Sequence, residues 1–240
     1  MAGPSKPSAD QTTESTRRQR PRPGLGKRFG PASRTAAVPP PAALGFRAHS
    51  GWAALVALSG PPEAPTVLRR TRLELIEPGV PRQPYHEAEG EELVKAEKII
   101  ARTRDVATQK AASAVQLLTA DLQRQGYEVA VCGVLQASGR NLPGLSQILA
   151  SHALIHTAEG QLFRDVLATA CEGKGFSVLR VKEKELFASA AQRLHLPINE
   201  VQSRVTGLGR GIGPPWGQDQ KCAALIAWMA LDHACEGTGP

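Results

Sequence analysis

The residues best suited to metal chemistry lie in the segment SHALIHTAEG, residues 151–160. His152, His156 and Glu159 are spaced i, i+4 and i+7, which places them on one stripe of a helix. Two histidines one helical turn apart can chelate Zn²⁺ or another borderline metal, and Glu159 can complete or orient such a site. Because this spacing is common in proteins, a polar stripe that only faces solvent is the alternative interpretation.

Two further polar residues are expected near this stripe. His49 ends the first of two apolar strands in GFRAHSGWAALVAL, residues 45–58, and Asp219 begins the final helix. Open α/β sheets place their ligands at the carboxyl ends of strands, where the helix from about residue 151 is also expected to begin. The sequence thus predicts a metal site, of Zn²⁺ or Mn²⁺ rather than Mg²⁺, with ligands from His152, His156, Glu159 and Asp219. A metal-free acid–base set is the alternative, with the catalytic residues His49, Glu159 and Asp219.

The loop before the final helix carries candidate nucleic-acid contacts. GLGRGIG, residues 207–213, follows a helix rather than a strand and lacks a GK[ST] ending, which excludes a P-loop. Arg210 and an exposed Trp216 are candidates for contacting a nucleic-acid backbone and stacking on a base. Lys221 is a candidate phosphate contact. The alternative for the loop is a flexible connection between helices, and the alternative for Lys221 is a lysine that only begins the final helix.

The surrounding elements follow from hydrophobic periodicity. Residues 44–77 predict three consecutive antiparallel strands, and 91–125 predict a long helix without Pro or Gly. A buried strand at 127–136, a helix at 151–173, a fifth strand at 175–181 and further helices follow. The order β-β-β-α-β-α-β-α-α predicts one α/β domain over residues 44–235, a mixed sheet with helices on both faces.

This order resembles the ribonuclease H-like superfamily, and within it the RuvC-type Holliday junction resolvases. The resemblance spans about residues 44–231 and is carried by these segments: GFRAHSGWAALVAL, LFRDVLATACEGKGFSVLRVKEKEL and VTGLGRGIGPPWGQDQKCAALIAWMAL. It implies metal-dependent phosphodiester hydrolysis on branched DNA, with three or four carboxylates holding two Mg²⁺ ions.

The family's acidic positions are mostly replaced in this chain. The first-strand acid falls on His49, the fourth-strand acid on Cys132 or Gly133, and the last-helix acid on Asp219. One retained carboxylate is not a two-metal site. The resemblance therefore implies a nucleic-acid-associated domain with altered or lost nuclease activity.

Charge and proline content separate a tail from this domain. Residues 1–43 carry 8 of the 19 prolines, and the stretch to residue 44 holds +6 of the formal net charge of +7. We expect residues 1–43 and 236–240 to be disordered, the tail being a basic arm for phosphates or a plain extension. The nearly neutral remainder counts against strong nonspecific DNA binding.

The remaining expectations concern location, partners and competing functions. Four cysteines without CxxC spacing and no apolar run of spanning length predict a cytoplasmic protein without a membrane partner. Candidate partners are branched DNA or RNA, and a second copy in a homodimer. The cofactor is left open, with a divalent metal, Mn, Zn or Mg, as the candidate. The competing functions are an active nuclease with a non-standard His/Glu/Asp site and an actin-like nucleotide-handling or scaffold domain.

Overall fold

The computed structural model describes Gly3 and residues 38–137 and 141–236, with side chains of the last helix described as far as His233. Contacts divide the chain into Met1–Ala37 and Val38–Pro240, and the fold below is that of the second unit. Its elements are β1 Pro41–His49, β2 Trp52–Ser59, β3 Thr66–Glu74, α1 Pro84–Glu87, α2 Leu93–Arg124, β4 Glu128–Gln136, α3 Leu145–Leu149, α4 His152–Glu172, β5 Ser177–Lys182, a 3₁₀ turn η1 Glu183–Glu185, α5 Leu186–Arg193, α6 Ile198–Gly207 and α7 Gln218–Glu236.

The five strands form one mixed sheet in the order β3-β2-β1-β4-β5. β1 pairs antiparallel with β2, and β2 pairs antiparallel with β3. β4 runs parallel to β1, and β5 runs parallel to β4. The carboxyl ends of β1, β4 and β5 therefore meet at one edge of the sheet. This confirms the predicted α/β architecture, including the three antiparallel strands at its start.

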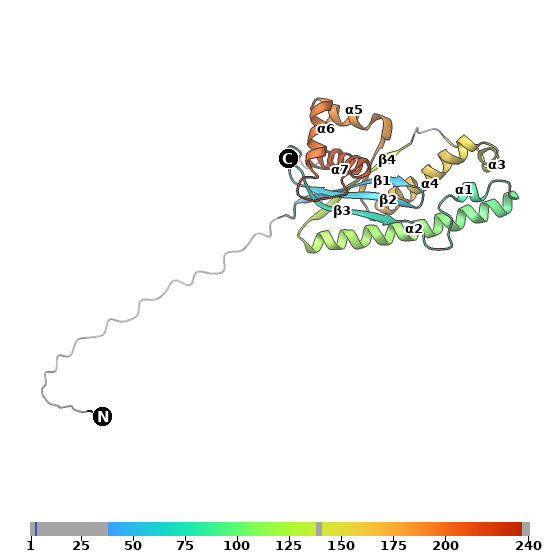
Figure 1. The fold of residues 1–240 in the computed structure, drawn as a ribbon, viewed down its shortest axis with the longest axis horizontal. Coiled ribbons are helices and arrows are strands. Elements are labelled where there is room, and N and C mark those ends of the chain that lie inside the picture. Colours follow the sequence, from blue (N-terminus) through green and yellow to red (C-terminus); the bar gives the residue numbers. More distant parts are fainter. Residues whose placement is uncertain (1–2, 4–37, 138–140, 237–240) are drawn as a thin grey trace. The chain divides into compact units, whose positions relative to one another are not determined.

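Helices cover both faces of the sheet (Figure 1), and each face has its own core. The alternation of β1 assigns its residues to the two faces, since successive side chains of a strand point in opposite directions. Leu44 and Phe46 belong to the core that α2 and α4 cover, whereas Ala43 belongs to the core built around α7. Gly45, Arg47 and His49 follow Ala43 in the same alternation and so face α7.

Two glycines bring α7 against the sheet. Gly45 on β1 and Gly133 on β4 are direct partners in the parallel register. A Cβ atom at Gly45 would lie 1.9 Å from the Ala223 carbonyl oxygen, and one at Gly133 would lie 2.7 Å from the Ile226 carbonyl oxygen. Any side chain at either position would collide with the backbone of α7. These glycines therefore set how closely the start of α7 approaches the edge of the sheet.

The element boundaries differ from the predictions in three places. The sheet begins at Pro41 rather than at residue 44, because Ala42 and Ala43 are already buried. The segment between β3 and α2, for which no element was predicted, contains α1, where Pro84 occupies the first turn that tolerates proline. A further short helix, α3, precedes α4. The predicted disorder of residues 1–43 and 236–240 falls mostly outside the described residues. Within them, residues 41–43 belong to β1 and residue 236 belongs to α7.

Among the described residues, no helix combines the length and apolar character that crossing a membrane requires.

Candidate functional site

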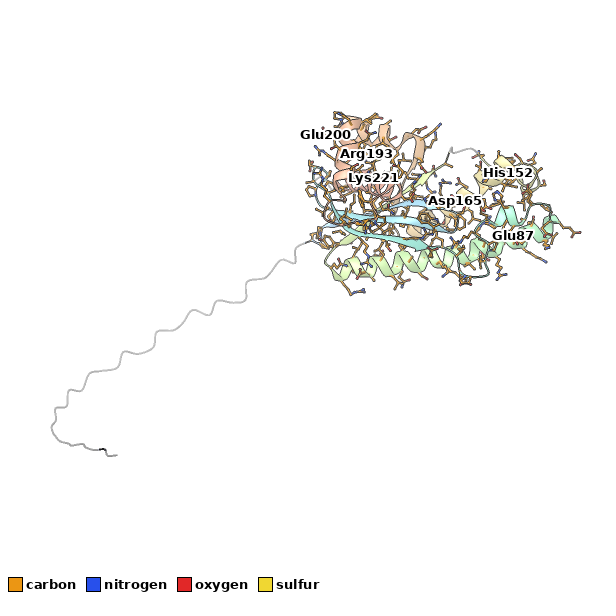
Figure 2. All side chains as sticks on the ribbon, in the orientation of Figure 1. Glu87, His152, Asp165, Arg193, Glu200 and Lys221 are labelled. Atoms are coloured by element: carbon orange, nitrogen blue, oxygen red, sulfur yellow. The ribbon has the colours of Figure 1, made fainter. Side chains whose placement is uncertain are left out.

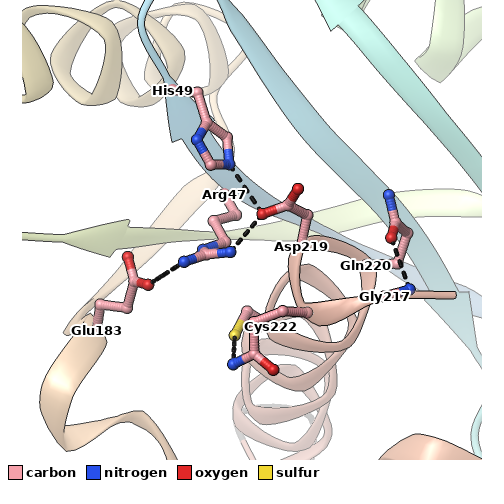
Figure 3. Close-up of polar contacts among 8 residues, drawn as sticks. Arg47, His49, Glu183, Gly217, Asp219, Gln220 and Cys222 are labelled. Carbon is pink, nitrogen blue, oxygen red and sulfur yellow. Dashed lines mark hydrogen bonds and ion pairs between the residues drawn. The ribbon is translucent and has the colours of Figure 1, made fainter.

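Four charged or titratable side chains meet at the carboxyl edge of the sheet, and we call them the edge cluster: Arg47, His49, Glu183 and Asp219. Arg47 and His49 come from the end of β1, Glu183 directly follows β5, and Asp219 lies in the first turn of α7. Arg47 forms ion pairs with both Asp219 and Glu183, donating to Glu183 Oε1 from Nη2 at 2.5 Å and from Nε at 3.1 Å. The guanidinium thus joins two carboxylates from opposite sides (Figure 3).

Asp219 Oδ1 also contacts His49, whose Nε2 lies 2.9 Å away. The same oxygen accepts from Arg47 Nη1, so one carboxylate oxygen serves both β1 side chains (Figure 3). The structure therefore brings together two of the residues that the sequence proposed as catalytic, His49 and Asp219. It adds a cation, Arg47, which donates to the same Asp219 oxygen and which the sequence reasoning did not include.

An aromatic side chain extends the edge cluster toward β3. The Trp52 ring stacks on the His49 imidazole, with centroids 4.1 Å apart and planes 6° from parallel. Arg72 Cζ lies 3.6 Å from the centroid of the Trp52 ring, within the range of a cation–π contact. Because β2 lies between β1 and β3, the imidazole and the guanidinium flank the indole from opposite sides. The ring is held in place rather than free to stack on a base.

The electrostatic environment favours a charged Arg47. Burial lowers its pKa, but the hydrogen bond and charge of Glu183 and the nearby Asp219 outweigh burial, so the pKa of Arg47 is raised. Burial lowers the pKa of a second guanidinium, that of Arg164 on α4, and the positive charge of Arg47 also lowers it, whereas the negative charge of Glu183 raises it.

This set of residues does not fit the pair of Mg²⁺ ions that the resemblance implies. Mg²⁺ is held by carboxylate and other oxygen atoms in a regular octahedron. Here the Arg47 guanidinium lies between the only two carboxylates that the described contacts bring to the edge cluster. On β4, Gly133 faces α7 without room for a side chain, and Cys132 is buried in the opposite core.

The predicted stripe of His152, His156 and Glu159 divides into two kinds of residue. His152 and His156 are exposed and lie together, with 3.1 Å between their Nε2 atoms. Glu159 is only 2% exposed, and its Oε1 accepts the backbone N–H groups of Tyr85 at 2.7 Å and His86 at 3.1 Å. It therefore satisfies free N–H groups in the first turn of α1, which explains why a carboxylate is buried there.

The predicted grouping of Glu159 with His49 and Asp219 was wrong in its geometry. The contacts of Glu159 go to α1, including its Oε1 at 3.3 Å from His86 Nδ1, whereas Asp219 contacts β1. Figure 2 shows His152 beside α1, well apart from Lys221 on α7. Burial raises the pKa of Glu159, and the hydrogen bonds from His86 and Tyr85 lower it. The histidine stripe and the edge cluster are two separate sites.

The three predicted nucleic-acid contacts occupy different environments. Arg210 is exposed, and Lys221 is half-buried in the first turn of α7. The expectation of an exposed Trp216 was wrong, because the indole packs on Gly209 and its Nε1 donates to the Val205 carbonyl at 3.0 Å. The loop is not a free connection either, since Arg70 on β3 donates to the carbonyls of Gly213, Pro214 and Pro215.

Sequence reasoning missed Arg47, Glu183 and His86. The signal for Arg47 was the period of two in β1, which puts it on the same face as His49, one step further into the sheet. Glu183 follows directly on a parallel strand, the position where side chains gather at a sheet edge. His86 lies in α1, whose four residues are too few to show a period, so no local pattern distinguishes it from a loop residue.

Comparison with solved structures gives similarity at low sequence identity. The chain is similar to Thermus thermophilus RuvC, with a TM-score of 0.49 and 13% identity, covering 82% of this chain and 97% of that one. The chain is also similar to T. thermophilus RuvC in complex with a Holliday junction substrate, with a TM-score of 0.49 and 12% identity, covering 82% of this chain and 96% of that one. For the yeast mitochondrial Holliday junction resolvase Ydc2 the TM-score is 0.44 and the identity 13%, covering 82% of this chain and 80% of that one.

No family model and no curated protein sequence matches the chain. The fold follows from the strands themselves: an antiparallel β1–β3 unit, with β4 and β5 added parallel to β1. The described domain is therefore an α/β domain built on one mixed five-stranded sheet, the fold class that the sequence predicted.

Proposed function

We propose that this chain is a nucleic-acid-associated ribonuclease H-like protein that has lost metal-dependent nuclease activity. The observation that carries the proposal is the position of Arg47, whose guanidinium forms ion pairs with Asp219 and Glu183 at the sheet edge. The resemblance to the family implies carboxylates and divalent cations at this edge. A side-chain cation takes the place of the metal in balancing the carboxylates.

The positive charge of the Arg47 guanidinium persists over the physiological pH range, so it can balance the carboxylates permanently in place of a metal ion. An arginine remains protonated at every physiological pH, and the pKa of Arg47 is raised further by Glu183 and Asp219. A divalent ion entering the edge cluster would have to displace Arg47 from both carboxylates, and the freed guanidinium would repel the ion. We therefore expect neither Mg²⁺ nor Mn²⁺ to support phosphodiester cleavage.

The α7 side of the sheet edge offers cations for phosphate contacts. Arg72 and Arg210 are exposed, and Lys221 stands two residues after Asp219. Arg70 fixes the loop that bears Arg210 next to β3 through hydrogen bonds of 2.6–3.1 Å to its carbonyls. Phosphate contacts of this kind position a protein on nucleic acid without reading its sequence. The proposal therefore includes binding at this edge, which we call the α7 edge, without base specificity.

The loss of cleavage is tested with the full chain on a panel of four-way junction DNA, duplex DNA, RNA–DNA hybrid and single strands. Each is incubated with Mg²⁺, Mn²⁺ or Zn²⁺ beside an Asp219→Asn variant. We expect no cleavage above the level of the variant under any condition. Metal-dependent cleavage that Asp219→Asn abolishes would overturn the loss of activity and support an active nuclease with a non-standard site.

Binding at the α7 edge is tested through its salt dependence. Each phosphate contact to duplex DNA contributes about −0.9 to the slope of log K against log salt concentration. We expect Arg72→Ala combined with Arg210→Ala to weaken binding and make the slope shallower by about 1.8. The matched control removes two exposed arginines from α2 on the opposite face, Arg102→Ala with Arg124→Ala.

The control distinguishes the α7 edge from the basic tail. Equal slopes for the two double variants would mean that the α7 edge does not bind nucleic acid, whatever the tail contributes. Absence of binding to every member of the panel would overturn the proposal as a whole. A preference for the four-way junction over the duplex would identify branched DNA as the ligand class.

A further inference from the structure

Three histidine rings converge at the start of α4, away from the edge cluster. We call them the three-histidine cluster: His86 from α1, and His152 and His156 from α4. Each offers a ring nitrogen, and these three nitrogens all lie within 4.8 Å of one another. The ring centroids are 4.5–5.4 Å apart. His86 is brought to the other two only by the packing of α1 on α4.

The spacing of the nitrogens fits a tetrahedral metal. Ligand nitrogens about 2.0–2.1 Å from Zn²⁺ lie roughly 3.3 Å from each other in a tetrahedron. The His152 and His156 Nε2 atoms are 3.1 Å apart, close to that value. A hydrogen bond between two neutral imidazoles explains this one pair. It does not explain why a third ring nitrogen approaches the same point from another helix.

A buried carboxylate orients His86 toward this point. His86 Nδ1 lies 3.3 Å from Glu159 Oε1, and the Glu159 side chain is 3% exposed. When Nδ1 donates its proton to a carboxylate, Nε2 keeps its lone pair and the ring orientation is fixed. Histidines that ligate metals are typically held in this way by a carboxylate or carbonyl. Glu159 itself is a positioning residue rather than a ligand.

We propose that the three-histidine cluster binds one Zn²⁺ ion through three imidazole nitrogens, with the fourth position open to water. Imidazole ligands suit Zn²⁺, whereas Mg²⁺ requires oxygen ligands. His152 and His156 are exposed, so the ion can enter from solvent without a rearrangement of the core. The three-histidine cluster contains no residue of the α7 edge, and an ion bound there would link α1 to α4 by coordination.

The proposal is tested on the full chain, prepared without a polyhistidine tag, by titrating the metal-free protein with Zn²⁺ in a calorimeter. We expect one Zn²⁺ per chain and a rise in Tm of about 5 °C at saturation. His86→Ala, His152→Ala and His156→Ala should each weaken binding by at least about 100-fold. Glu159→Gln, which keeps an oxygen for the α1 N–H groups, should weaken it by about 10–100-fold.

The matched control is His195→Asn, which removes a histidine elsewhere on the surface. His195 has a φ of 52°, a conformation that asparagine tolerates. This variant should bind Zn²⁺ with unchanged affinity. Zn²⁺ binding that is absent in the wild type, or that survives in His86→Ala, would overturn the site.

A second measurement does not depend on the variants folding. Co²⁺ bound in place of Zn²⁺ to the wild-type chain should give the intense visible absorption of a four-coordinate site. The weak spectrum of a six-coordinate ion would overturn the tetrahedral arrangement. Circular dichroism of each metal-free variant shows whether lost binding reflects lost ligands or an unfolded chain. If an alanine variant is unfolded, His152→Asn is used instead, because residue 152 is exposed and the substitution removes a ligand without disturbing the core.

Discussion

Arg47 on β1 and Asp219 on α7, 172 residues apart in the chain, form an ion pair that joins the edge of the sheet to the first turn of the last helix. The Arg47 side chain is 19% exposed and that of Asp219 is 29% exposed, so water screens the pair only in part. Glu183 shares the same guanidinium from the far side. This relationship makes the edge cluster a contact that joins the end of β1 and the start of η1 to α7.

Replacing Arg47 by methionine should lower stability. Arg47→Met keeps an apolar stem of similar length but leaves Asp219 and Glu183 without their shared cation. We expect a loss of about 1–3 kcal/mol in the free energy of unfolding, measured with urea. Arg124→Met, at a residue whose side chain is 70% exposed, should cost less than about 0.5 kcal/mol. Equal losses in the two variants would contradict a structural role for the edge pair.

Exchanging the charge of Arg47 should create a metal response that the wild type lacks. In Arg47→Asp three carboxylates gather at the edge, where they repel one another but offer oxygen ligands to a hard cation. We expect its Tm to lie below that of Arg47→Asn in EDTA and to rise when Mn²⁺ is added. Arg47→Asn should not respond. If Mn²⁺ raised the Tm of the wild type as much as that of Arg47→Asp, this would contradict the idea that Arg47 excludes a cation.

Gly45 should not tolerate even a methyl group. The added Cβ of Gly45→Ala would lie 1.9 Å from the Ala223 carbonyl oxygen and 2.7 Å from the Ala227 nitrogen, both backbone atoms. We expect α7 to be displaced and unfolding in urea to show a loss of about 3 kcal/mol or more. Gly144→Ala is the control, because nothing lies within 4 Å of its Cβ and its φ is −62°. That variant should be unchanged or more stable by up to about 1 kcal/mol.

The buried thiols should react slowly in the native protein. The hydrogen bond with Cys171 and burial raise the pKa of Cys132, and burial raises that of Cys222. A raised pKa means a smaller thiolate fraction at pH 8, and the thiolate is the form that attacks a disulfide reagent. In a Cys235→Ser variant we expect native thiols to react with Ellman's reagent at least about 100-fold more slowly than in guanidinium chloride. Rapid native reaction would show that the core opens readily.

Much of the fold follows from local sequence patterns. The apolar runs of β1, β2 and β4, the period of two in β3 and the long stretch free of Pro and Gly in α2 each depend on neighbours within a few residues. The pairing of β1 with β2 needs only a short turn. Short helices escaped this reasoning, since the four residues of α1 are too few to show a period.

Local patterns along the chain specify the order of the elements, the α/β class and the replacement of most acids that the resemblance implies. Which charges meet depends instead on tertiary packing. Arg47 reaches Glu183 across 136 residues, and Glu159 holds α1 across 74. Such contacts depend on how closely α7 and α1 pack, which is set by distant features such as Gly45 and Gly133. Because a hydrogen bond requires placement to within a few tenths of an ångström, periodicity along the chain cannot specify it.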